Sequence, residues 1–121
     1  MLIEVRTDGN FQGSEQFSDQ VKIFVLEALE RFADRIRRVD VHLSDEVGDK
    51  PGHGNQCCMI EVRRNEREPI VVTHCDPTVG QAIHGAVHSL KRSIESAFGR
   101  ESASAHRPLH RPGGDPVDGP L

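Results

Sequence analysis

The sequence predicts a small α+β domain, a two-layer fold in the order β-α-β-β-β-α. Four short segments alternate apolar and polar residues with the two-residue period of a strand. Two longer segments carry apolar residues at spacings of three and four, as helices packed on a core do. With 121 residues, the chain is long enough for one small core and too short for two ordinary domains.

The first strand is expected over residues 2–7, and a long helical pattern follows it. Ile3 and Val5 point to one face of this strand and their polar neighbours point to the other. Ser14 is placed to cap the helix. The apolar stripe of the helix contains Phe17, Val21, Phe24, Val25, Ala28, Leu29, Phe32 and Ile36.

Three further strands are expected over residues 39–44, 58–63 and 70–75, because each segment alternates apolar and polar side chains. The composition of residues 48–55 is that of a loop, rich in glycine. The tight connection at 65–68 makes the last two strands an antiparallel hairpin.

A second helix closes the domain, with Thr78 as its cap and Gly99 as its end. Its apolar stripe contains Val79, Ala82, Ile83, Ala86, Val87, Leu90, Ile94 and Phe98. Two helices with one apolar stripe each must cover the same face of one sheet. The first strand–helix–strand unit makes its two strands parallel. We therefore predict a four-stranded mixed sheet with both helices on one face.

The domain is expected to comprise residues 1–99. Residues 100–121 are rich in proline and glycine, and their few apolar residues show no period. Such a segment cannot offset its ordering entropy by burial, so it is predicted to be a disordered tail.

Composition excludes several classes of protein. No run approaches the roughly 18 apolar residues of a membrane span, so no membrane association is expected. The first ten residues show no signal peptide, which predicts a cytoplasmic protein. Three cysteines are an odd number, and without an export signal they are expected to be reduced thiols. The net charge of −4 argues against simple polycation binding but leaves room for a local basic face.

The chain offers no convincing catalytic or metal site. Cys57, Cys58, His74 and Cys75 lie on neighbouring predicted strands, and zinc accepts such ligands. However, adjacent residues of a strand point to opposite faces, so neither adjacent pair can ligate together. The same geometry separates a Cys75 nucleophile from His74. Since no nucleotide-binding or hydrolase motif is present either, we expect no enzyme, no metal, no cofactor and no small-molecule substrate.

Basic residues cluster best on and just after the second helix. The cluster consists of Lys91, Arg92 and Arg100, with His88 one turn upstream. The planar guanidinium group of arginine can donate two parallel hydrogen bonds to a phosphate, which suits contact with an RNA backbone. Further candidates are Arg63 and Arg64 at the hairpin, and Arg35 and Arg38 at the end of the first helix. The alternative is an ordinary solvated surface.

Several stretches resemble the ribosome hibernation-promoting factor family, also called the sigma-54 modulation or ribosome-associated inhibitor family. They are FADRIRRVDVHLS at 32–44, the spacing of Ser, Phe and Val at 14–21, DPTVGQAI at 76–83 and LKRSI at 90–94. The resemblance covers roughly residues 1–98, in the same order of elements.

This resemblance implies a function. Short members of the family bind the small ribosomal subunit in the channel used by mRNA and tRNA and silence translation during stress. The implied partner is therefore ribosomal RNA, contacted through its backbone. Longer members add a C-terminal dimerisation domain, and residues 100–121 are too short and too polar to form one.

A second hypothesis is a regulatory protein-interaction module on the same fold, without ribosome binding. The outward side of the first helix is acidic and opposes contact with phosphates. It includes Glu15, Asp19, Glu27, Glu30 and Asp34. The partner surface in that case is the sheet face away from the helices, where Met59, Val71 and Cys75 are candidates.

Overall fold

The computed structural model describes residues 1–8, 15–46 and 55–105, and the expected cap at Ser14 and most of the predicted tail lie outside them. The elements, in chain order, are β1 (Leu2–Thr7), α1 (Glu15–Leu29), a 3-10 helix η1 (Glu30–Arg35), β2 (Arg38–Glu46), β3 (Asn55–Arg64), β4 (Arg67–Asp76) and α2 (Val79–Ala105).

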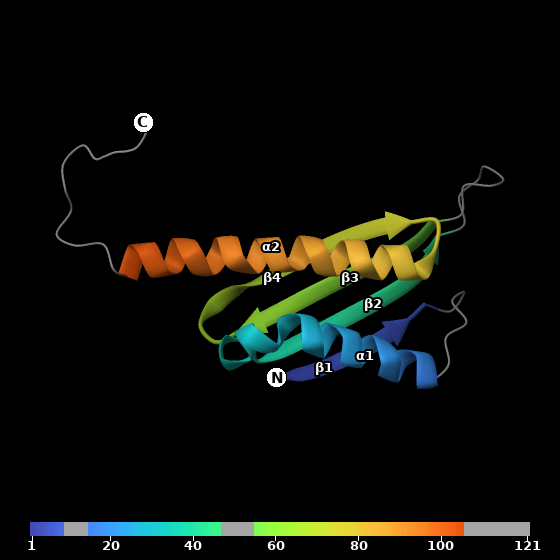
Figure 1. The fold of residues 1–121 in the computed structure, drawn as a ribbon, viewed down its shortest axis with the longest axis horizontal. Coiled ribbons are helices and arrows are strands. Elements are labelled where there is room, and N and C mark those ends of the chain that lie inside the picture. Colours follow the sequence, from blue (N-terminus) through green and yellow to red (C-terminus); the bar gives the residue numbers. More distant parts are fainter. Residues whose placement is uncertain (9–14, 47–54, 106–121) are drawn as a thin grey trace, which may run out of the picture.

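The four strands form one mixed sheet in the order β1-β2-β3-β4. β1 runs parallel to β2, whereas β2, β3 and β4 are successively antiparallel. Both helices lie on the same face of this sheet, α1 near β1 and α2 along β3 and β4 (Figure 1). The predicted two-layer α+β architecture is confirmed.

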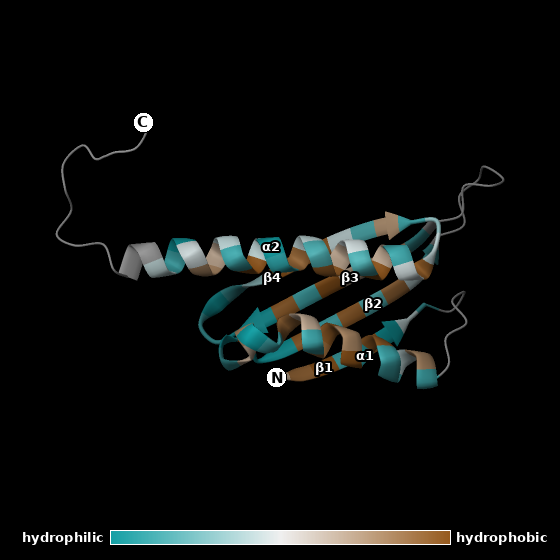
Figure 2. Ribbon diagram, viewed as in Figure 1, coloured by the Kyte–Doolittle hydropathy of each residue, from teal (hydrophilic) through white to brown (hydrophobic). Residues whose placement is uncertain are grey.

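The core lies between the sheet and the two helices. The alternation of apolar and polar residues along β2 and β3 is visible as alternating brown and teal (Figure 2). Fully buried side chains come from both layers: Val25 and Leu29 of α1, Val39 and Leu43 of β2, Ile60 and Val62 of β3, and Leu90 and Ile94 of α2. Ile3 and Val5 are only partly buried, because β1 is an edge strand.

Both helices differ from their predicted lengths. The first ends as an α-helix at Leu29 and continues as η1. The prediction that Gly99 ends the second helix is wrong, since α2 continues to Ala105. A glycine lowers helix stability by only about 1 kcal/mol. Contacts of neighbouring residues offset this cost. Phe98, just before Gly99, is buried, and Glu101, just after it, forms an ion pair with Arg64 of β3.

The start of α2 matches its prediction. The Gln81 backbone N–H donates to the Thr78 hydroxyl at 3.2 Å, and the Ala82 N–H donates to the Thr78 carbonyl at 3.0 Å. Thr78 therefore caps the helix, satisfying donors that would otherwise lack a partner.

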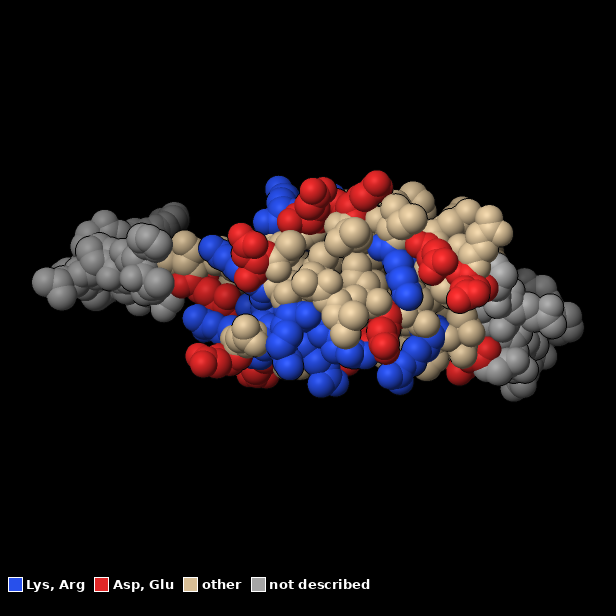
Figure 3. All heavy atoms as spheres, turned by 90° about the horizontal axis from the view of Figure 1, so that it is seen from below, with Lys and Arg blue, Asp and Glu red and all other residues tan. Residues whose placement is uncertain are grey.

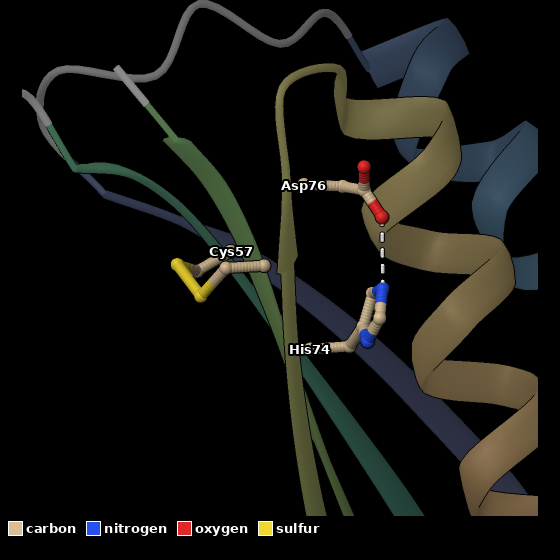
Figure 4. Close-up of a disulfide and its surroundings, with 4 residues drawn as sticks. Cys57, His74 and Asp76 are labelled. Carbon is tan, nitrogen blue, oxygen red and sulfur yellow. Dashed lines mark hydrogen bonds and ion pairs between the residues drawn. A yellow bond between two sulfur atoms is a disulfide. The ribbon is translucent and has the colours of Figure 1, made fainter. Parts of the chain in front are cut away.

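The expectation that all three cysteines are reduced thiols is wrong. Cys57 and Cys75 are direct partners in the register of β3 and β4, and a disulfide joins them on the face away from α2 (Figure 4). Cys58 points the other way and is fully buried in the core. Burial raises the pKa of the Cys58 thiol to about 12, so it stays protonated and unreactive.

We predict that reducing this disulfide lowers the melting temperature. The bond links residues 18 positions apart, and closing a loop of that size stabilises a fold by about 3 kcal/mol. Thermal unfolding with and without a thiol reductant measures the effect. The variant Cys57→Ser with Cys75→Ser should melt at the reduced temperature and ignore the reductant. An unchanged wild-type melting temperature would contradict the assignment.

The end of β4 packs closely against α2 through the side chain of His74. His74 and Asp76 both point from β4 toward the helix, and the His74 Nε2 lies 2.9 Å from Asp76 Oδ2 (Figure 4). The imidazole occupies the space beside Gly85 of α2, where a Cβ atom would overlap the ring. A larger residue at position 85 would therefore require the imidazole of His74 to move.

We predict that Gly85→Ala gains less stability than its helix propensity of about 1 kcal/mol allows, or loses stability, because the added methyl group displaces His74 from its place beside Asp76. Gly99→Ala is the matched control in the same helix, where an added Cβ meets no atom within 4 Å. That change should stabilise the protein by up to about 1 kcal/mol through helix propensity alone. Chemical denaturation of both variants compares them. Equal stabilisation by the two alanines would refute the close approach.

Candidate nucleic-acid interface

The exposed residues of α2 lie on two flanks, one on each side of its buried stripe. Positions 84, 88, 91 and 95 follow helical spacing and form one flank. This flank faces α1, because the rings of His84 and Phe24 lie 4.6 Å apart and Glu95 forms an ion pair with Arg31. Lys91 and His88 therefore belong to the side of α2 that is nearer to α1.

The other flank of α2 borders a hollow at the edge strand β4. The hollow has a volume of about 520 Å³. It is lined by Pro69, Ile70, Ser89, Arg92, Ser93, Ser96, Ala97 and Arg100. We call it the α2–β4 hollow. The structure thus brings together Arg92 and Arg100 of the predicted cluster and places Lys91 on the opposite flank.

The α2–β4 hollow has the chemistry of an anion site. The Arg100 guanidinium donates to the Ser96 hydroxyl at 2.7 Å. Within the described part of the chain, neither Arg92 nor Arg100 forms an ion pair with a carboxylate. Two guanidinium groups beside serine hydroxyls present several donors to one ligand, and phosphate oxygens accept such donors.

Arg64 is committed to internal contacts. Its Nη1 donates to both carboxylate oxygens of Glu101 at 2.8 and 3.0 Å, and its Nη2 donates to the Glu68 carbonyl at 2.9 Å. The guanidinium also lies over the Phe98 ring, and only 7% of the side chain is exposed. Arg64 therefore fastens the last turns of α2 to β3 and has little surface left for a ligand.

Arg38 is also held internally, on the outer face of the sheet. It donates to Asp40 at 2.9–3.1 Å and to Glu4 at 2.7 Å. These bonds hold the pKa of the Asp40 carboxyl below its usual value. Glu4, Asp40 and Glu61 are direct cross-strand neighbours, so Arg38 offsets the repulsion within a row of three acids.

The outer sheet face also carries a shallow basic hollow at its Arg38 end. Arg6, Arg37 and Arg63 line it together with Arg38, and its volume is about 420 Å³. Seen from the side of β1 and α1, Lys and Arg atoms gather in one broad patch with acidic groups around it (Figure 3). Arg63 lies 3.4 Å from Glu61, so part of this charge is balanced locally.

Arg35 lies at the end of η1, where its guanidinium sits 4.7 Å from the centre of the Phe98 ring. It is exposed and forms a cation–π contact that covers the core near α2. The eight predicted residues thus do not form one site: Arg92 and Arg100 line the α2–β4 hollow, whereas Arg38 and Arg63 line the hollow on the outer face of the sheet.

Sequence reasoning missed the serines of the α2–β4 hollow. Ser89, Ser93 and Ser96 recur at spacings of four and three, which places them on one face of the helix. That spacing was visible in the sequence. Their part in the α2–β4 hollow is seen only in the structure, where β4 lies beside this face of α2.

The sequence of the domain matches a known family over nearly all of its described length. Residues 3–101 match the family model described as Sigma 54 modulation protein / S30EA ribosomal protein. The chain belongs to this family. It is a family of ribosome-associated modulation factors, for which translation regulation and the stress response are the consistent roles.

Two solved structures show the same fold as this family member. A ribosomal subunit interface protein from Coxiella burnetii is 12% identical, with a TM-score of 0.63, and the match covers 82% of this chain and 99% of that one. The N-terminal domain of Protein Y from Thermus thermophilus is 23% identical, with a TM-score of 0.62, and the match covers 79% and 98% of the two chains. No curated protein sequence matches this chain.

Two other kinds of site are absent from the described residues of this family member. Among the described residues, no helix is long and apolar enough to cross a membrane. The same residues contain no group of three His, Cys, Asp or Glu side chains arranged to hold a metal ion.

We predict that acid destabilises the protein partly through Glu101. Hydrogen bonding to Arg64 lowers the pKa of the Glu101 carboxyl in the folded state. The folded state then binds fewer protons than the unfolded state, whose glutamates titrate near pH 4.3. The stabilisation is complete above that pH and is lost as the pH falls through the lower folded-state pKa.

Melting temperatures between about pH 7 and pH 2 test this dependence. Glu101→Gln should melt lower than wild type at neutral pH and lose less stability in acid. Glu68→Gln is the control, because Arg64 contacts the backbone carbonyl of that residue rather than its carboxylate. Parallel acid curves for wild type and Glu101→Gln would contradict the role of the pair.

Proposed function

We propose that this protein is a ribosome-associated translation inhibitor of the hibernation type. It acts in the cytoplasm and binds the small ribosomal subunit through contacts with the rRNA backbone. The observation that carries the proposal is the α2–β4 hollow, where two arginines without carboxylate partners in the described chain stand beside three serine hydroxyls. Membership of a ribosome-associated family supports it.

The geometry of α2 suits a run of phosphates. Arg92 and Arg100 are separated by two helical turns, which is about 12 Å at 1.5 Å per residue. They can therefore contact different phosphates of one strand, with the hydroxyls of Ser93 and Ser96 between them. His88 and Lys91 extend the basic surface across the helix toward α1. Arg63 and Arg35 are secondary contacts, whereas Arg38 and Arg64 are left out because internal acids hold them.

The mode of recognition is contact with the backbone rather than reading of bases. The side chains of Phe32 and Phe98 are buried, and those of Phe17 and Phe24 pack against the core. None of the four described phenylalanines is exposed as a platform on which a base could stack, since two are buried and two are partly buried against the core. A domain that binds the phosphate backbone would inhibit translation by occupying part of the subunit surface, without catalysing a reaction.

Neutralising the hollow tests the proposal. The variant Arg92→Gln with Arg100→Gln should weaken co-sedimentation with purified small subunits. It should also flatten the dependence of affinity on salt, by a slope of roughly one for each phosphate that is no longer neutralised. Affinity measured at several salt concentrations from about 50 to 200 mM gives this slope.

A matched control removes two charges from other faces: Lys22→Gln with Arg6→Gln. Its salt slope should remain that of wild type, and all three proteins must melt alike. Equal slopes for both double variants would show that net charge, rather than the hollow, drives binding. If wild type itself fails to bind at about 50 mM salt, the interaction-module hypothesis replaces this proposal. Met59 and Val71, which are 38% and 53% exposed on the outer sheet face, then become the first surface to examine.

A further inference from the structure

The outer face of α1 exposes two large apolar side chains. The buried residues Val21, Val25 and Leu29 mark the side of α1 that packs on the sheet. Ile23 lies about 180° around the helix from the centre of that stripe, at 100° per residue. It is 56% exposed, and Leu26, one turn further on, is 45% exposed. Because both helices lie on the same face of the sheet, α1 turns this side to solvent (Figure 1).

Three acidic residues lie around this apolar pair, together with one basic residue, Lys22, which is one turn before Leu26. Asp19 lies one turn before Ile23, Glu27 one turn after it and Glu30 two turns after it. Within the described residues, none of the three carboxylates forms an ion pair. The nearest arginine along the chain, Arg31, is already paired with Glu95 of α2. We call the surface of Asp19, Ile23, Leu26, Glu27 and Glu30 the α1 outer face.

We propose that the α1 outer face docks a basic polypeptide segment that carries an apolar anchor. The anchor packs on Ile23 and Leu26, and lysines or arginines of the same segment pair with the acidic rim. Apolar surface left exposed at the centre of a charged rim is the arrangement of a protein-binding site. The charge of the rim selects the partner by complementarity.

Charge also rules against the other occupants of an exposed helix face. RNA phosphates and anionic lipid headgroups would both meet unpaired carboxylates. A second copy docked by two-fold symmetry would bring two acidic rims together. The proposal does not rest on RNA binding, because the α2–β4 hollow is on another helix.

A labelled model peptide tests the surface in the full chain. The probe is a fluorescent peptide of lysine and leucine, about 14 residues long, with leucines at helical spacing on one side. Its control has every leucine replaced by serine, which keeps the charge and removes the anchor. Fluorescence anisotropy at about 50 and 200 mM salt measures affinity. Wild type should bind the leucine peptide more tightly than the serine peptide, and more weakly at the higher salt.

Two variants separate the apolar and the charged parts of the α1 outer face. Ile23→Ser with Leu26→Ser should lower the affinity at least on the order of tenfold, since the anchor then has no apolar surface to bury. Asp19→Asn, Glu27→Gln and Glu30→Gln together should weaken binding and reduce its salt dependence. Val71→Ser is the matched control, an equally exposed apolar residue on the other side of the sheet, and should bind as wild type.

The result that overturns the proposal is equal binding by wild type and the Ile23→Ser, Leu26→Ser variant, or equal binding of both peptides. Self-association of wild type that this variant abolishes would also overturn it, in favour of a second copy. Sedimentation equilibrium measures that outcome. The Arg92→Gln, Arg100→Gln variant should bind the peptide normally, so a failure of the RNA-binding proposal is seen separately, in the small-subunit assay.

Discussion

The whole molecule depends on one constraint: two helices must bury their apolar stripes on the same face of one four-stranded sheet. The fully buried side chains of the sheet, such as Val39, Leu43 and Ile60, all lie on that face, whereas the opposite face carries mostly charged residues together with the exposed Met59 and Val71. The opposite face therefore stays in water and has to be stable without a covering layer. The structure achieves this with rows of charge, in which Arg38 holds two acids of neighbouring strands, and with a disulfide between the last two strands.

The same constraint decides which basic residues are available for function. Where α2 passes the end of the sheet, it needs an anchor, and the Arg64–Glu101 pair over Phe98 provides one. Arginines at the sheet end are thus used for packing. Beside β4 no further strand follows, so the flank of α2 with Arg92 and Arg100 stays open. The net charge of −4 says little about binding, because affinity for phosphates depends on these unpaired groups rather than on the sum.

The sequence was sufficient to predict the order of elements and the layer arrangement, because these follow from the period of apolar residues within each segment. It was not sufficient for features that depend on register between segments. The pairing of Cys57 with Cys75 requires the alignment of β3 with β4, whereas the expectation of free thiols rested on compartment and on cysteine number. Arg64 is buried because α2 continues past Gly99 and brings Glu101 beside it. Local propensity alone predicted that the helix would end at this glycine. The α2–β4 hollow joins two segments whose relative placement no local pattern specifies.

The acidic first helix and the proposed RNA contact are compatible because they lie on opposite sides of α2. α1 packs near β1, and the flank of α2 that faces it carries the Arg31–Glu95 pair. The α2–β4 hollow opens on the other flank, beside the edge strand at the far side of the sheet. Packed helix axes are about 8–10 Å apart, so the acids of the α1 outer face lie more than one helix away from a phosphate in the hollow. At physiological ionic strength the screening length is about 8 Å, which leaves only weak repulsion over that distance. Opposite charges on neighbouring helices therefore allow one small layer to present two chemically distinct surfaces at once.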